Sequence, residues 1–164
     1  MIEPWISGSH AEADPLLRPI LHAFDHARAD LVMWTADLTT AQIWARPFGL
    51  AAVGFHLRHI ARSSERLFTY AQGMPLTEAQ LAAASTEMDA GATRDELLAD
   101  LDGVFERIAR QVRELNPATI RETRVVGRLQ LPATVAGLLV HIAEHTMRHV
   151  GEAIITAKVA KQAG

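Results

Sequence analysis

Apolar residues recur every three or four positions along most of the chain, and short stretches rich in polar residues, proline and glycine interrupt the pattern. This spacing puts apolar side chains along one face of a helix, which is typical of amphipathic helices that share a core. Four long stretches have the pattern: residues 14–38, 50–73, 92–115 and 131–160. They predict an all-α fold, a four-helix bundle with short connecting helices.

Three capping boxes mark where helices should begin. In each, a threonine is followed three residues later by a glutamine or glutamate, so that the two side chains can satisfy each other's backbone N–H groups. The pairs are Thr39 with Gln42, Thr77 with Gln80, and Thr93 with Glu96. They predict short helices after residues 39 and 77 and the start of the third long helix.

Other boundary signals are proline and glycine residues. Asp14 and Pro15 suit the N-cap and first position of the first helix, but Pro19 leaves open that the helix begins there instead. Gly73 should end the second long helix, and Pro117 the third. Residues 121–131 alternate like extended chain and predict a small hairpin around Gly127. We therefore expect one domain over residues 1–164, with its core at about residues 13–160.

The composition of the chain excludes several classes of function. The chain has 164 residues, 49% of them hydrophobic, and a net charge of −3 without a basic block, so neither disorder nor nucleic-acid binding is expected. It has no cysteine, which excludes disulfides, cysteine-ligated zinc and a thiol nucleophile of its own. No secretion signal and no membrane-spanning run is visible, and we expect a cytoplasmic protein.

The candidate chemistry lies in "HIAEHTMRH", residues 141–149, where three histidines follow one another at intervals of four. His145 and His149 fall where the apolar face of the helix would continue, whereas His141 lies to one side of it. His141 and His149 are also two turns apart, about 12 Å along the axis, too far to share one ion. The spacing therefore selects His145 with His149 as a possible ligand pair.

A further ligand should come from a facing helix, and periodicity leaves several candidates. In the second long helix the apolar stripe lies nearer His56 than His59, and the first helix offers a second pair, His22 with His26. A lone helical histidine is more often an ordinary polar side chain, and we expect that of His10, His22 and His26. No HExxH motif is present, so a zincin protease is not indicated, and carboxylate-rich helix faces for a ferritin-like di-metal site are lacking.

Taken in order, three segments resemble the DinB/YfiT-like family of proposed metalloenzymes. They are "LTTAQIWARP" (38–47), "FHLRHIARSSERLFTYAQG" (55–73) and "LLVHIAEHTMRHVGEAI" (138–154), and the likeness covers residues 13–160. The resemblance implies a four-helix bundle in up-down-down-up order, often a homodimer. It also implies one divalent metal, zinc or nickel, held by His59, His145 and His149. His56 then becomes a neighbour of the ligands.

The chain departs from the family after the last ligand. Many members read His-Arg-Gly-Gln there, but Val150 and Glu152 replace the arginine and the glutamine, and Arg148 precedes the ligand. Glu152, one turn beyond His149, is expected either to hydrogen-bond a ligand or bound water, or to be a solvated residue. His141 is a candidate hydrogen-bond partner. Three arginines lie beside the ligand positions and could either bind substrate carboxylates or be exposed charges: Arg58, Arg62 and Arg148.

The resemblance further implies a metal-dependent transferase that joins a low-molecular-weight thiol, such as bacillithiol, mycothiol or glutathione, to an electrophile. Thiol-dependent isomerisation and metal-assisted hydrolysis are related activities. The alternative is a non-catalytic bundle that serves as a metal-binding or dimeric interaction module. An open coordination position beside a pocket would favour the enzyme.

Overall fold

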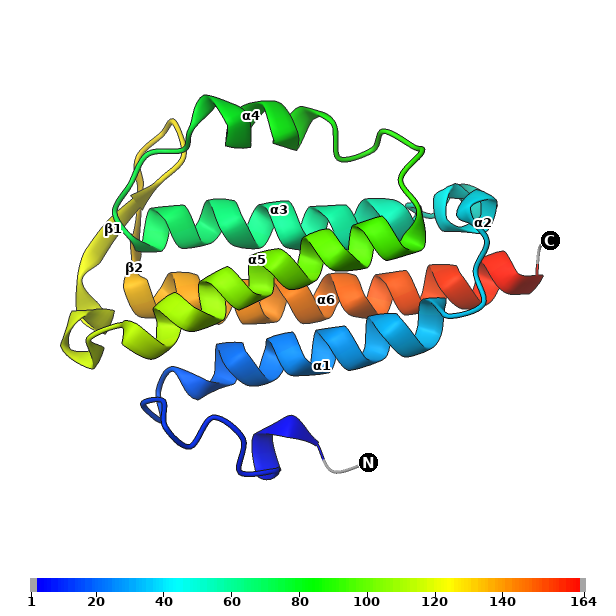
Figure 1. Ribbon diagram of the computed structural model, residues 1–164. Coiled ribbons are helices and arrows are strands. Elements are labelled where there is room, and N and C mark those ends of the chain that lie inside the picture. Colours follow the sequence, from blue (N-terminus) through cyan, green and yellow to red (C-terminus); the bar gives the residue numbers. More distant parts are fainter. Residues whose placement is uncertain (1–2, 163–164) are drawn as a thin grey trace.

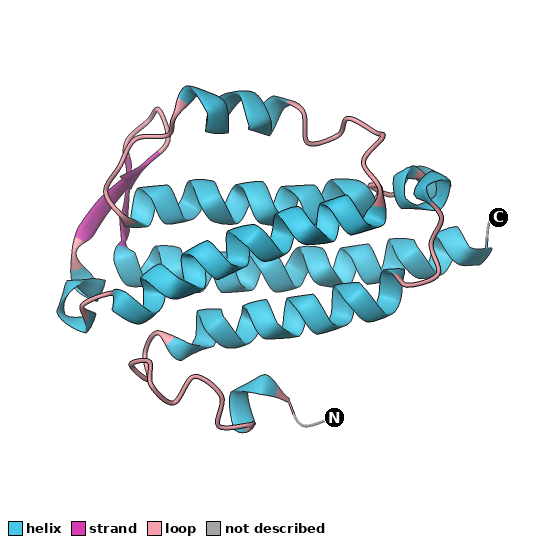
Figure 2. Cartoon of the chain, in the orientation of Figure 1, coloured by secondary structure: helices cyan, strands magenta, loops and turns pink. Residues whose placement is uncertain are grey.

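The computed structural model describes residues 3–162, and helices dominate it (Figure 2). Four long helices lie side by side, with shorter elements at their ends and along one flank (Figure 1). The long helices are α1 (Arg18–Thr35), α3 (Val53–Ala71), α5 (Arg94–Glu114) and α6 (Val135–Gln162). The shorter elements are η1 (Pro4–Ile6), α2 (Thr40–Trp44), η2 (Pro47–Gly49), α4 (Glu78–Ser85), η3 (Pro117–Arg121), β1 (Thr123–Val126) and β2 (Leu131–Thr134).

The long helices run in the order up, down, down, up. Figure 1 shows α1 and α6 running in one direction and α3 and α5 in the other. Helix α4 returns along α3, so α5 starts at the same end of the bundle as α3 did. Helix α6 packs against both α1 and α3, and α3 also packs against α5. The predicted all-α fold is confirmed, and its packing sets the histidines of α6 against α3.

The capping boxes form as predicted at α2, α4 and α5, with the threonine and its partner bonded reciprocally in each case. The start of α1 follows the second of the two predictions, because its N-cap is Leu17 and Pro19 lies in its first turn. A helix starting at Asp14 would put Pro19 at its fifth position, where the ring would clash with a backbone carbonyl. Asp14 instead accepts a hydrogen bond from the N–H of Leu16 at 2.8 Å.

The core runs along the inside of the long helices. Phe24 of α1 stacks on Phe105 of α5, with ring centroids 4.0 Å apart. The hairpin is confirmed, with Gly127 in the turn at a φ of 69°, and β2 extends it to Thr134. Between residues 3 and 162, no helix has both the length and the apolar character needed to cross a membrane.

Candidate metal centre

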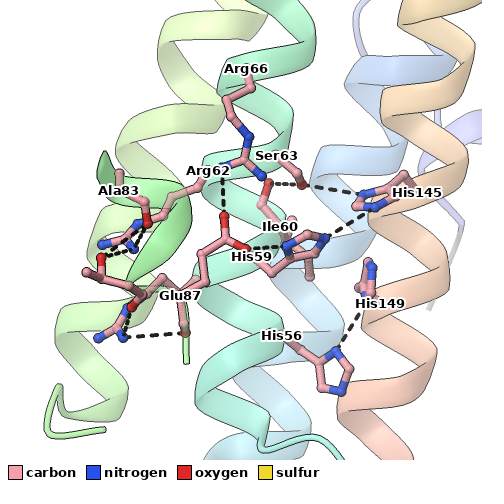
Figure 3. Close-up of polar contacts among 12 residues, drawn as sticks. His56, His59, Ile60, Arg62, Ser63, Arg66, Ala83, Glu87, His145 and His149 are labelled. Carbon is pink, nitrogen blue, oxygen red and sulfur yellow. Dashed lines mark hydrogen bonds and ion pairs between the residues drawn. The ribbon is translucent and has the colours of Figure 1, made fainter. Parts of the chain in front are cut away.

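Three histidines from two helices converge where α3 packs against α6 (Figure 3). His59 of α3 and His145 of α6 face each other, with their Nε2 atoms 3.3 Å apart. The ring of His149 lies 4.6 Å from that of His59 and 4.5 Å from that of His145. One nitrogen from each of the three lies within 4.8 Å of the other two, so together they could hold a metal ion.

A buried glutamate fixes the orientation of His59. Glu87, in the connection after α4, is 7% exposed, and its Oε2 lies 2.6 Å from Nδ1 of His59. Its other oxygen accepts a hydrogen bond from Nη1 of Arg66 at 2.7 Å (Figure 3). Burial raises the pKa of Glu87, but the hydrogen bonds from His59 and Arg66 outweigh it and leave the pKa below its usual value. A charged carboxylate therefore holds Nδ1–H of His59 and leaves Nε2 directed at His145.

The other two histidines also have partners for Nδ1. Glu152 Oε2 lies 2.7 Å from Nδ1 of His149. Of the two roles considered for Glu152, this contact matches the hydrogen bond to a candidate ligand. Ser63 Oγ lies 3.4 Å from Nδ1 of His145, a longer and weaker contact. Histidine ligands of metals usually donate their second ring N–H to such a partner, which fixes the ring and its tautomer. The surroundings of all three rings suit metal binding through Nε2.

His56 belongs to a second, overlapping group. Its Nδ1 lies 3.1 Å from Nδ1 of His149 and 3.5 Å from Oε2 of Glu152. These three residues could also hold a cation. Periodicity of α3 favoured His56, and the family pattern favoured His59. Both residues contact His149. This group and the first are the two groups of possible metal ligands found within residues 3–162.

Burial lowers the pKa of His56, His145 and His149, which favours the uncharged imidazole in each. The pKa of His56 is lowered to about 4, chiefly by burial and then by the charge that His149 would carry when protonated, while Glu152 opposes the shift. Burial and the same kind of neighbours lower the pKa of His145 to about 4. The pKa of His149 is also below its ordinary value, chiefly because of burial. A neutral imidazole has the free lone pair that a metal requires, so the lowered pKa values of His145 and His149 favour binding of a divalent ion.

An aromatic side chain covers part of the site. Phe55 stacks on the ring of His59, with centroids 5.2 Å apart and planes 18° apart, and it lies nearly perpendicular to the ring of His149 at 6.4 Å. An apolar wall of this kind limits access of water to the ligands and lowers the local dielectric constant.

Two of the three predicted substrate-binding arginines donate hydrogen bonds to backbone carbonyls of the chain. Nη1 of Arg58 donates to the backbone carbonyls of Thr86 and Asp89, and Nη1 of Arg62 donates to the carbonyl of Ala83. With Arg66 they form a row along α3 that fastens the segment carrying Glu87. This geometry gives Arg58 and Arg62 a structural role.

The remaining predicted residues lie outside the cluster or at its edge. His141 is exposed and pairs with Glu144 at 3.8 Å, while its ring lies 5.5 Å from that of His145. Arg148 also pairs with Glu144.

The histidines at the N-terminal end have other partners. His10 pairs with Asp25 at 2.7 Å, and His22 contacts the carbonyl of Ser9 at 3.3 Å. Neither they nor His26 belong to the two groups of possible metal ligands found within residues 3–162.

Glu87 is a member of the site that the sequence did not reveal. It follows α4 in the segment "STEMD", which has neither helical periodicity nor a motif. Its role depends on how the α4 segment folds back over α3, which no local signal encodes.

Comparison with known protein families shows which family has this sequence pattern. The family model described as the DinB superfamily matches residues 23–153, a span that includes every residue of both histidine groups. A search among curated proteins returned no match.

Proposed function

Because the chain belongs to the DinB superfamily, and because three of its histidines could share a metal, we propose that it is a metal-dependent enzyme. In this proposal His59, His145 and His149 hold one divalent ion, zinc or nickel. The observation that carries the proposal is the oriented set of imidazoles, in which Glu87 and Glu152 hold the Nδ1 atoms of His59 and His149 at 2.6 and 2.7 Å.

Three protein ligands leave a coordination position for a substrate or water, which is characteristic of catalytic rather than structural zinc. A divalent ion there would lower the pKa of a bound thiol or water and polarise a substrate oxygen. The surrounding side chains would orient the ligands and limit the access of water. Glu87 keeps His59 in one tautomer, Glu152 does the same for His149, and Phe55 shields one side from water.

We further propose thiol S-transfer as the reaction class. A low-molecular-weight thiol would be the nucleophile, which agrees with a chain that has no cysteine of its own. Its sulfur would form a bond to carbon of the electrophile, the leaving group would depart with the bonding electrons, and the thiol proton would pass to water. Metal-assisted hydrolysis would use the same site, with water in place of the thiol. Assembly as a homodimer, as the resemblance implies, stays a prediction.

The test is to load the protein with zinc or nickel and to measure the rate at which glutathione and related thiols react with 1-chloro-2,4-dinitrobenzene or monobromobimane. We expect a metal-dependent rate above the uncatalysed reaction that His145→Ala abolishes. If the fully loaded protein is no faster than His145→Ala with any thiol or in ester hydrolysis, the enzyme proposal fails. The bundle would then be better described as a metal-binding or interaction module.

A further inference from the structure

A groove runs beside the candidate metal centre, between α6 and the segment that follows η2. Its volume is about 890 Å³, within the range of small-molecule sites. Leu50 and Ala51 form one side, and Ile154 and Ile155 of α6 contribute to the other. Most of this lining is apolar, and Phe48, which precedes the groove-lining Gly49, is 93% exposed.

One end of the groove is polar and adjoins the histidines. Glu152 lines the groove and also holds Nδ1 of His149 at 2.7 Å. His56 lines it as well, with its Nδ1 3.1 Å from that of His149. Ile155 and Thr156 lie up to seven residues beyond His149 along α6, which is about 10 Å of helix. The groove thus extends along α6 from His56 and Glu152, which contact His149, to an apolar end.

We propose that this groove binds the apolar part of a small amphiphilic substrate whose polar head coordinates the metal held by His59, His145 and His149. This inference rests on the metal centre proposed above and adds the substrate class to it. The head group would carry an oxygen or sulfur donor, and the remainder would be an alkyl chain or ring of several carbons. Glu152 and His56 would flank the junction between the two parts.

Gly151 offers a way to close the groove without disturbing the fold. It lines the groove, and a Cβ added to it would have no neighbouring atom within 4 Å. Because Gly151 lies within α6, a leucine there also favours the helix. Gly103→Leu in α5 is the matched control, since its Cβ would meet only the end of the Arg107 side chain, at 3.5 Å.

The experiment measures binding of alkyl hydroxamates, from acetohydroxamate to octanohydroxamate, to zinc-loaded protein by calorimetry. In the wild type and in Gly103→Leu we expect affinity to rise about two- to fourfold for each added methylene group, as apolar burial predicts. In Gly151→Leu the rise should disappear, while acetohydroxamate binds as it does to the wild type.

Two results would overturn the inference alone: a flat series in fully loaded wild type, or the same rise in Gly151→Leu. A wild-type dimer that Gly151→Leu dissociates, with a flat series in both, would show that a second copy covers the groove, and would also overturn it. Zinc content is measured first by mass spectrometry. A wild type that takes up no zinc overturns the proposed function and, with it, this inference.

Discussion

Glu87 Oε2 lies 2.6 Å from Nδ1 of His59, although 28 residues separate the two in the chain. The contact links the connection after α4 to the candidate metal ligands. Arg66 completes it by donating to the second carboxylate oxygen at 2.7 Å. The segment of α4 and its following connection flanks the bundle in Figure 1, and through Glu87 it contributes to the candidate metal centre.

Glu87→Gln should weaken zinc binding by about 10- to 100-fold, the usual effect of losing the hydrogen-bond partner of a metal ligand. The neutral amide has a single acceptor oxygen, so it cannot accept from both Nδ1–H of His59 and Arg66, and it forms no ion pair with Arg66. The measurement is zinc affinity in competition with a chromophoric chelator.

Glu65→Gln is the control for that experiment, because Glu65 also lies on α3 but pairs with Arg107 at 2.9 Å, at a half-exposed site. It should bind zinc like the wild type. Equal affinity in all three proteins would show that Glu87 does not support the ligand.

Gly54→Ala should destabilise the fold by about 1–3 kcal/mol, the cost of overpacking, although alanine favours a helix over glycine. A Cβ at Gly54 would lie 2.8 Å from the indole ring of Trp44. That ring cannot move freely, because its Nε1 donates to the carbonyl of Ala92 at 2.7 Å and the Arg58 guanidinium lies over it. Urea unfolding would measure the change.

Gly151→Ala is the matched substitution, since its Cβ would have no neighbour within 4 Å. It should stabilise the protein by up to about 1 kcal/mol. Effects of the same sign in both variants would contradict the close packing of Trp44 against α3.

The metal-free protein should lose stability as the pH falls from 6.5 towards 4. The unfolded chain protonates His56 near its ordinary pKa of 6.5, whereas the folded protein does so only near 4. Protons therefore bind the unfolded state more strongly in this window, and stability falls with decreasing pH. His56 alone would contribute a loss of about 3 kcal/mol once the pH is below 4.

Urea unfolding of metal-free protein at several pH values between 4 and 7.5 tests this expectation. His56→Gln, which cannot titrate, should have a shallower dependence than the wild type. If the two pH profiles are parallel, protonation of His56 is not coupled to unfolding.

The parts of the fold that could be predicted are those that depend on neighbours in sequence. The capping boxes at Thr39, Thr77 and Thr93 form as predicted, because each needs residues only three apart. The hairpin follows from alternation around Gly127. The start of α1 was left open between two prolines, and the cost of a proline inside a helix decides it.

The candidate site was predictable only in part. The interval of four residues between His145 and His149 placed both on the same side of α6. His56 and His59 are three residues apart, so they lie on the same side of α3, and apolar periodicity could not separate them. Both contact histidines of α6. Glu87 acts across a long-range contact that the sequence gives no means of locating.

The most direct test of the metal centre is metal content by mass spectrometry on tag-free wild type and on His59→Ala, His145→Ala and His56→Ala. We predict about one ion per chain in the wild type and in His56→Ala, and loss of the ion in His59→Ala and His145→Ala, as expected for a site with three protein ligands. Loss in His56→Ala with retention in His59→Ala would place the ion in the group of His56, His149 and Glu152. A wild type that takes up neither zinc nor nickel would contradict the metal centre altogether.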